Sequence, residues 1–423
     1  MSGEANGGRA NGTPREKPVI GYLTRVKIEN IRSIASLAWD VTPGPGWNVV
    51  LGDNGSGKST FLRAVAYIML PHDQSAALRI DPTIWLREDE DYGELYVRSQ
   101  VSSDTVAPFA AHASLTLRGP ASSWEVERVP ALDEVITCGF GPFRRFTGRD
   151  PEYDQQLDAF PRVARVASLF DERFTFSETL AWLRQHVFKE LVENDDASKD
   201  LLHSLQSFIN GESLLPNGVR LDRILPDTPM FVDASGFEVR LRDLSDGYRS
   251  MLSLVLTLVR HLVAHYGADH VFDRATKAVI APGIVLIDEI EAHLHPTWQR
   301  QIGFLLRKHF PNIQFVVTTH SPVICEAATA DTDTVYRLPR PGTDERFHKV
   351  TGAELDILLY GNLAEAYETE AIGLVGRSEK AQALLDRLGA LNRKEIDVGL
   401  ADGERKEQRR LRDIFPAALE RRT

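Results

Sequence analysis

A glycine-rich stretch holds the residues of this chain that are best suited to bind phosphate. Residues 52–60 read Gly-Asp-Asn-Gly-Ser-Gly-Lys-Ser-Thr and fit the pattern G-x-x-x-x-G-K-[ST]. The glycines let backbone N–H groups close around phosphate oxygens, and the start of a following helix adds positive charge. In this pattern Lys58 reaches the β- and γ-phosphates, and the Ser59 hydroxyl binds Mg²⁺. The loop therefore predicts ATP and Mg²⁺ as ligands. Its predicted nucleotide-binding residues are Asn54, Gly55, Ser56, Gly57, Lys58, Ser59 and Thr60.

Two carboxylates follow an apolar run much later in the chain. Residues 283–287 read Gly-Ile-Val-Leu-Ile and are followed directly by Asp288 and Glu289. Such a run is typical of a buried parallel strand that carries acids at its C-terminal end. At that position Asp288 binds Mg²⁺, directly or through water, and Glu289 polarises the attacking water as a general base. The pattern thus predicts a phosphate-cleaving site.

Apolar strands and helices must position these residues. A strand over residues 47–51 precedes the phosphate loop, and a helix over residues 61–70 follows it. Buried strands are predicted at 283–287 and at 314–319, and a long helix follows residue 248. This order predicts an α/β fold with a largely parallel sheet.

Composition divides the chain into five predicted segments. The first is Gly-, Asn- and Pro-rich with almost no apolar content, which indicates a disordered tail. Short alternating runs between residues 75 and 135 predict an antiparallel β lobe, and residues 160–215 predict helices without sustained heptads. The predicted segments are the tail 1–18, a first lobe 19–150 with the β lobe, a helical insertion 151–216, a second lobe 217–340 and a C-terminal helical region 341–423.

The charge balance limits the possible partners. Lys and Arg number 49 and Asp and Glu number 60, so the net charge is −11. A protein that coats nucleic acid would be basic, and any DNA contact must therefore use a local patch. Only two cysteines are present, which excludes a disulfide framework. The chain has no signal peptide and no long apolar span, so we expect a cytoplasmic protein without membrane contact.

One loop is a candidate for such a patch. Residues 139–149 combine glycine and aromatic residues with Arg144, Arg145 and Arg149. The arginines could contact phosphate groups of nucleotide or DNA, and the aromatic rings could stack on bases. A structural turn with solvated arginines is the more common explanation of such a run.

The motifs occur in the order found in the SMC/RecF-like branch of ABC ATPases, which the chain resembles. The phosphate loop matches Walker A, and the two carboxylates match Walker B. Residues 244–248, Leu-Ser-Asp-Gly-Tyr, match the signature, and His320 matches the H-switch. The resembling region spans residues 22–338, about three quarters of the chain. The resemblance implies a P-loop NTPase head of the ABC type. It also implies that Ser245 and Gly247 bind the γ-phosphate held by another subunit, and that His320 is a catalytic contact of the γ-phosphate.

Five further residues are interpreted through the resemblance. Arg32 lies between two predicted strands, where the family residue reaches the nucleotide, although a surface arginine in a turn is the alternative. Asp246 replaces a signature glycine, so its role is open, and it could cap the following helix. Glu291, His293 and His295 could suggest a metal site, but in the family this stretch crosses to the partner subunit.

The forms of these motifs resemble the stand-alone ATPases of bacterial phage-defence systems such as Septu, PARIS and some retrons. OLD-like nucleases share the ATPase but append a TOPRIM domain, whose acidic D-x-D is absent after His320. The resemblance therefore implies an ATPase without its own nuclease. It implies a head-to-tail homodimer, or a higher even oligomer, that closes on ATP and Mg²⁺ and serves a separate nuclease or toxin as sensor or scaffold. A RecF-like DNA-repair ATPase is the alternative, and a transporter cassette fits less well because of the extra lobes.

Overall fold

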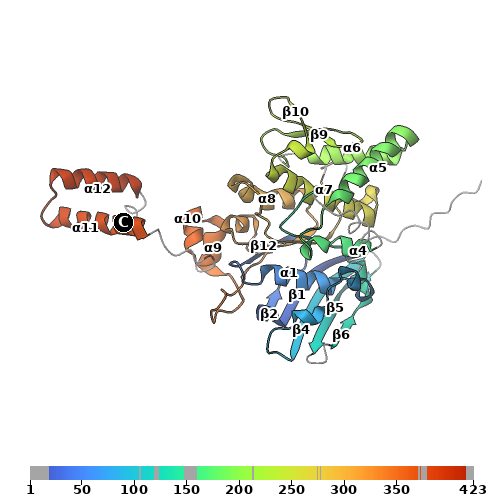
Figure 1. The fold of residues 1–423 in the computed structure, drawn as a ribbon, viewed down its shortest axis with the longest axis horizontal. Coiled ribbons are helices and arrows are strands. Elements are labelled where there is room, and N and C mark those ends of the chain that lie inside the picture. Colours follow the sequence, from blue (N-terminus) through green and yellow to red (C-terminus); the bar gives the residue numbers. More distant parts are fainter. Residues whose placement is uncertain are drawn as a thin grey trace, which may run out of the picture. The chain divides into compact units, whose positions relative to one another are not determined.

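The computed structural model describes residues 19–103, 106–118, 123–146, 160–211, 214–273, 275–276, 278–369, 372 and 379–415. The predicted tail at residues 1–18 and Arg149 lie outside the described residues. The chain forms two compact units, a large one that reaches Ala366 and a small one that contains Tyr367–Thr369 and the described residues after 373. Figure 1 shows the elements of each unit.

A six-stranded sheet carries the candidate site in the large unit. Its order is β14-β13-β3-β12-β11-β7, and the neighbours from β13 to β7 pair in parallel, while β14 is antiparallel to β13. Every residue of β3, β11 and β12 is buried, as expected for parallel strands covered on both faces. The strands are β3 (Gly46–Leu51), β7 (Thr137–Phe140), β11 (Gly283–Ile287), β12 (Ile313–Thr319), β13 (Val335–Arg337) and β14 (His348–Lys349).

A five-stranded antiparallel sheet forms the β lobe. Its order is β2-β1-β4-β5-β6, and buried and partly buried residues alternate along β4. Helix α1 (Lys58–Met69) contacts strands of both this sheet and the six-stranded sheet (Figure 1). The strands are β1 (Ile20–Ile31), β2 (Ile34–Asp40), β4 (Tyr92–Ser103), β5 (Val106–Arg118) and β6 (Ser123–Arg128).

Helices and a small third sheet complete the large unit. Helix α5 packs against α6 and against α7, a 21-residue helix whose apolar side chains are mostly buried. The third sheet has the order β10-β9-β8, from β8 (Arg220–Ile224), β9 (Pro229–Val232) and β10 (Glu238–Arg240). The helices are α1 (Lys58–Met69), α2 (His72–Ser75), α4 (Pro161–Ala164), α5 (Ser177–Glu193), α6 (Asp196–Ile209), α7 (Asp246–Tyr266), α8 (Pro296–His309) and α9 (Gly352–Tyr360). Helix α10 (Leu363–Glu368) begins in the large unit, and its last two residues belong to the small one.

The small unit contains two helices with their own apolar contacts. Helices α11 (Glu379–Asp397) and α12 (Asp402–Ile414) bury Leu388, Leu391 and Leu411 against each other. Within the described residues of either unit, no helix is both long and apolar enough to cross a membrane. The predicted fold class is confirmed: the α/β structure combines a largely parallel sheet with an antiparallel β lobe and a helical region.

Candidate functional site

The phosphate loop connects the end of β3 to the start of α1. Gly55 and Gly57 have φ values of 80° and 101°, in the left-handed region that side chains disfavour. Gly57 is also the N-cap of α1 and forms no side-chain cap, so the first-turn N–H groups remain available to an anion. The predicted residues Ser59 and Thr60 lie in that first turn. The local backbone therefore has the geometry of a phosphate-binding loop.

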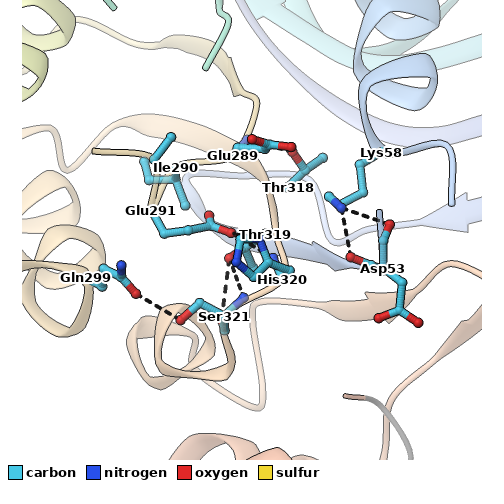
Figure 2. A network of polar contacts seen from close by, with 12 residues as sticks. Asp53, Lys58, Glu289, Ile290, Glu291, Gln299, Thr318, Thr319, His320 and Ser321 are labelled. Atoms are coloured by element: carbon cyan, nitrogen blue, oxygen red, sulfur yellow. Dashed lines mark hydrogen bonds and ion pairs between the residues drawn. The ribbon is translucent and has the colours of Figure 1, made fainter. Parts of the chain in front are cut away.

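Two buried polar groups inside the loop fit a phosphate ligand. The Lys58 ammonium donates hydrogen bonds to the carbonyl oxygens of Gly52 at 2.8 Å and Asp53 at 3.0 Å (Figure 2). The Ser56 hydroxyl is buried and has no hydrogen-bond partner. Because buried polar atoms are usually paired, an unpaired hydroxyl in this loop is consistent with a ligand that bonds to it.

Two arginines that the sequence did not single out flank the loop. Arg337, at the end of β13, lies 3.7 Å from the Asp53 carboxylate, and Arg340 lies 3.6 Å from it. Arg337 is 2% exposed, and burial lowers its pKa, as does the nearby Arg340. These arginines could be predicted only from the pairing of β13 with β3, which places Arg337 beside Leu51.

Parallel pairing brings the predicted carboxylates to the same sheet edge as the loop. Strand β12 lies between β3 and β11, so the carboxyl ends of all three strands meet there. Asp288 is 1% exposed and accepts a hydrogen bond from the Thr318 hydroxyl at 2.6 Å. The Ser59 hydroxyl and the Asp288 carboxylate are oxygen ligands of the kind that Mg²⁺ prefers, so these residues fit the metal.

Glu289 adopts an unusual backbone conformation. Its φ is 45°, in the left-handed region where residues other than glycine are uncommon. Its N–H donates to the Thr318 hydroxyl at 3.0 Å, so one threonine holds both Asp288 and Glu289. Thr318 was not predicted from the sequence. Its signal is the parallel register, in which Ile287 pairs with Val317 and the next residues lie side by side.

His320 follows β12 and lies beside Glu291. Its Nδ1 is 2.8 Å from the Glu291 carboxylate, and its side chain is 60% exposed (Figure 2). This hydrogen bond raises the pKa of His320 against the opposing effect of burial, and Lys58 and Glu289 also act on it. The metal site considered for Glu291, His293 and His295 is not formed: the described residues contain no cluster of three such ligands.

Arg144 has a different role from the one considered. It is 4% exposed and donates to five backbone carbonyls and to the Ser250 hydroxyl, so its interpretation as a phosphate or DNA contact is wrong. Burial lowers its pKa to about 10, and Glu291 opposes that effect. Arg145 is exposed. The carbonyls belong to Gly141, Asp288, Glu289, Ile290 and Ala292.

Arg32 lies in the turn between β1 and β2. A Cβ at Gly57 would come within 2.8 Å of the Ser33 hydroxyl, so this turn packs directly on the phosphate loop. The Arg32 guanidinium lies 5.8 Å from the Trp85 ring, and burial lowers its pKa, with a further contribution from Arg63. The structure thus places Arg32 next to the loop, and its nucleotide contact stays a prediction.

The signature turn starts helix α7. Ser245 is the N-cap without a side-chain cap, and Asp246 is exposed and pairs with Arg249. Asp246 therefore does not cap the helix, and its carboxylate is held by an arginine. A Cβ at Gly247 would lie 3.4 Å from the His293 carbonyl, in ordinary contact. Within the described residues, no hydrogen bond or ion pair joins Ser245 or Gly247 to the phosphate loop of the same chain.

A cavity of about 610 Å³ lies beside the signature. Its polar lining is dominated by arginines, opposed by Asp227 and Asp246, and Phe146 and Leu180 form part of the apolar lining. Apart from Arg144, the lining arginines are Arg145, Arg240, Arg242 and Arg249.

Two family models match parts of the chain. Residues 159–326 match the model described as "AAA domain, putative AbiEii toxin, Type IV TA system", and residues 25–78 match one described as "AAA domain". Between them they contain the phosphate loop, the signature, both carboxylates and His320.

The curated relatives include Septu proteins named PtuA and probable ATPases of retrons. The chain is 26% identical over 307 residues to the Septu protein PtuA of Bacillus mycoides, covering 71% of this chain and 38% of that protein. It is 24% identical over 321 residues to the Septu protein PtuA of Bacillus thuringiensis, covering 72% of this chain and 73% of that protein. It is 36% identical over 135 residues to the Retron Ec83 probable ATPase of Escherichia coli, covering 32% of this chain and 22% of that protein. The matches to the Bacillus mycoides and retron proteins thus span less than half of those proteins.

The solved structures that match the chain include the Smc head domain with an extended coiled coil, bound to the C-terminal domain of ScpA, from Pyrococcus furiosus. That similarity has a TM-score of 0.45 and 15% identity, and covers 78% of this chain and 97% of that chain. The family models and the curated relatives confirm the resemblance to Septu and retron ATPases. The chain is related to AAA-type ATPases of anti-phage systems.

Proposed function

We propose that the protein is a Mg²⁺-dependent ATPase that dimerises head-to-tail on ATP and acts as sensor or scaffold for a separate effector in anti-phage defence. One observation carries the chemistry: the phosphate loop, Asp288, Glu289 and His320 all lie at the carboxyl ends of β3, β11 and β12. At a parallel-sheet edge, these ends form the usual ligand site.

Each residue has a role set by its position. The loop N–H groups and Lys58 bind the β- and γ-phosphates, and Arg32 lies next to them. Ser59 and Asp288 would hold Mg²⁺, which would supply positive charge to the phosphates. Glu289 accepts a proton from the attacking water, and the His320 ring donates a hydrogen bond to the γ-phosphate.

A second chain completes the site in this proposal. Ser245 and Gly247 bond to no part of their own phosphate loop, and the uncapped start of α7 offers its N–H groups to an anion. In a two-fold head-to-tail pair, each ATP lies between Lys58 of one chain and Ser245 of the other.

Mixing two inactive variants tests this arrangement. Lys58→Ala removes phosphate binding, and Ser245→Arg places bulk and charge in the partner's site, so each variant alone should be inactive. Random reassortment makes about half the dimers mixed, each with one intact site, and should restore roughly a quarter of the wild-type sites. ATP hydrolysis of the mixture is measured after subunit exchange has been verified with labelled chains. Activity no higher than that of either variant alone would exclude the shared site.

The effector is the finer part of the proposal. Similarity to the Septu and retron proteins supports a partner such as a nuclease or toxin. The purified chain should hydrolyse ATP without cutting DNA, and a pull-down with Glu289→Gln from the native host should retain the effector. Mg²⁺-dependent DNA cleavage that copurifies with the chain and is lost on mutation of its own carboxylates would contradict a separate effector.

A DNA-binding, RecF-like repair function is the second candidate. The arginine-lined cavity offers this function a basic patch. The patch differs from the predicted one at Arg144, Arg145 and Arg149, because the Arg144 guanidinium is bonded to backbone carbonyls such as that of Asp288. Replacing Arg145 and Arg240 with Ala should lower DNA affinity and flatten its salt dependence if the patch contacts phosphates. An unchanged salt slope would remove the cavity from DNA binding.

A further inference from the structure

Glu291 bonds to His320 through a single carboxylate oxygen. Its Oε1 accepts the His320 backbone N–H at 2.8 Å and lies 2.8 Å from the ring Nδ1 (Figure 2). The carboxylate is 3% exposed, and its Oε2 is buried without a partner. One acceptor thus fixes both the main chain and the ring of the residue assigned to the γ-phosphate.

The turn that carries Glu291 is itself held in place. Arg144 donates to the carbonyls of Ile290 and Ala292, on either side of Glu291. Thr318, two residues before His320, accepts the Ile290 N–H at its carbonyl. The turn that carries Glu291 and the segment that carries His320 are thus joined by other hydrogen bonds as well. The bond from Glu291 to His320 can therefore orient the ring without being the sole support of the local fold.

The contact requires a proton on Nδ1. Burial acts to raise the pKa of Glu291, but hydrogen bonding, chiefly from His320, outweighs it, and the net pKa lies below the usual value. An ionised carboxylate oxygen only accepts, so the Nδ1 atom at 2.8 Å must be the donor. A neutral His320 ring in this contact consequently has its lone pair on Nε2, the nitrogen that does not face Glu291.

A lone pair on Nε2 is unsuitable for phosphate, whose oxygens only accept. The ring can donate from Nε2 while Nδ1 stays bonded to Glu291 only when both nitrogens carry protons. The charged groups acting on the ring are Glu291 and Glu289, which favour the imidazolium, and Lys58, which disfavours it.

We propose that Glu291 is the positioning residue of His320, and that its bond to Nδ1 makes the imidazolium the form that meets the γ-phosphate. ATP binding is then coupled to proton uptake at His320 when the solution pH is above the His320 pKa of the free protein. This inference rests on the proposed function, in which His320 contacts the γ-phosphate. It adds a residue role that the Walker and signature motifs do not contain.

Calorimetric titration with ATPγS and Mg²⁺ tests the coupling. Binding to the full chain at about pH 8 is measured in buffers of different ionisation enthalpy, and the slope gives the protons taken up. Wild type should take up a substantial fraction of a proton more than Glu291→Gln. A Gln amide can donate to Nδ1, so the neutral ring can present N–H from Nε2 without a new proton. Glu326→Gln, which removes the carboxylate that pairs with Arg300, is the matched control and should behave like wild type.

Hydrolysis gives a second readout. Glu291→Gln should lower kcat roughly tenfold, less than the roughly 100- to 10,000-fold effect of a direct general acid or base, because Glu291 acts only through His320. ATP affinity should be nearly unchanged. In a His320→Asn background, the same substitution should have little further effect, because residues that act through one another are not additive. His320→Asn and Glu291→Gln should take up the same number of protons on binding ATPγS. Either variant can therefore test the inference if the other folds poorly.

The outcomes separate this inference from the proposed function. Equal proton uptake in wild type, Glu291→Gln and His320→Asn, with normal ATPγS binding, would overturn the coupling and leave the ATPase intact. If Glu291→Gln lowered kcat in the His320→Asn background as much as it does in wild type, the coupling would also be overturned, because Glu291 would then act through a residue other than His320. Failure of wild type to bind ATPγS would overturn the proposed function and this inference together.

Discussion

Replacing Arg144 with alanine should destabilise the large unit far more than an ordinary arginine substitution. The side chain is buried and donates to five carbonyl oxygens and one hydroxyl, and Asp288, Glu289 and Glu291 all act on its charge. Its removal takes a donor from each of those carbonyls, although the Glu289 carbonyl keeps a second donor, the Ala292 N–H. It also removes a buried cation beside the carboxylates of Asp288 and Glu291.

The magnitude follows from the burial. A buried acceptor left without its donor costs about 1–3 kcal/mol, and removing one partner of a buried charge pair costs about 3–5 kcal/mol because the remaining charge is left uncompensated. We take about 4 kcal/mol, which is at least about a quarter of a typical free energy of unfolding. At roughly 2 °C per kcal/mol for a large unit, the melting temperature should fall by roughly 5–10 °C.

Thermal unfolding without nucleotide measures the effect. Arg145→Ala is the matched control, since the neighbouring residue is exposed and should change stability by about 0.5 kcal/mol or less. Arg144→Lys should be intermediate, because an ammonium keeps the charge but cannot reach the same set of carbonyls. If Arg144→Ala and Arg145→Ala have the same melting temperature, the assignment of Arg144 as an internal support of residues 288–292 is refuted.

Three other substitutions test the site. Glu289→Gln should keep ATP binding and lose at least about a hundredfold in hydrolysis, measured by phosphate release; near-normal turnover would remove Glu289 as general base. Thr318→Val should lower kcat roughly tenfold, because Asp288 and Glu289 lose one shared partner. Thr257→Val, which removes the buried hydroxyl that bonds to Thr179, should not affect kcat, and an equal loss would show a general packing effect. Gly57→Ala should abolish ATP binding in equilibrium titration, since φ is 101° and the new Cβ would lie 2.8 Å from the Ser33 hydroxyl; wild-type affinity would contradict this.

Local patterns predicted the parts of the site that each strand carries by itself. The apolar runs at 283–287 and 314–319 are buried strands, and the carboxylates and His320 follow them directly. The glycines of the phosphate loop adopt the backbone angles that their residue type allows. These features depend on residues that are adjacent in the sequence, so a single amino-acid sequence is sufficient to predict them.

Contacts between distant segments could not be predicted in the same way. Arg144 and Asp288 are 144 residues apart, and Thr318 and Asp288 are 30 apart, yet each pair is hydrogen-bonded. Nothing local distinguishes Arg144 from the exposed Arg145 beside it. Which of the two arginines is buried is decided by the carbonyls that face the loop after β7, and these carbonyls converge only when β7 pairs with β11.

Residues 288–293 connect the two ends of the proposed mechanism. Arg144 bonds to four carbonyls of this segment, Thr318 holds its first two residues, and Glu291 reaches His320 from it. Its far end meets the signature, because the His293 carbonyl lies 3.4 Å from where a Cβ of Gly247 would be. Both Glu289 and His293 have positive φ, and the bonds from surrounding residues help to hold the segment in this conformation. In the proposed dimer, a change in the bonds at the γ-phosphate therefore acts on the same backbone that supports the surface facing the second chain. Substitutions in this segment should consequently change both the rate of ATP hydrolysis and the pairing of the two heads.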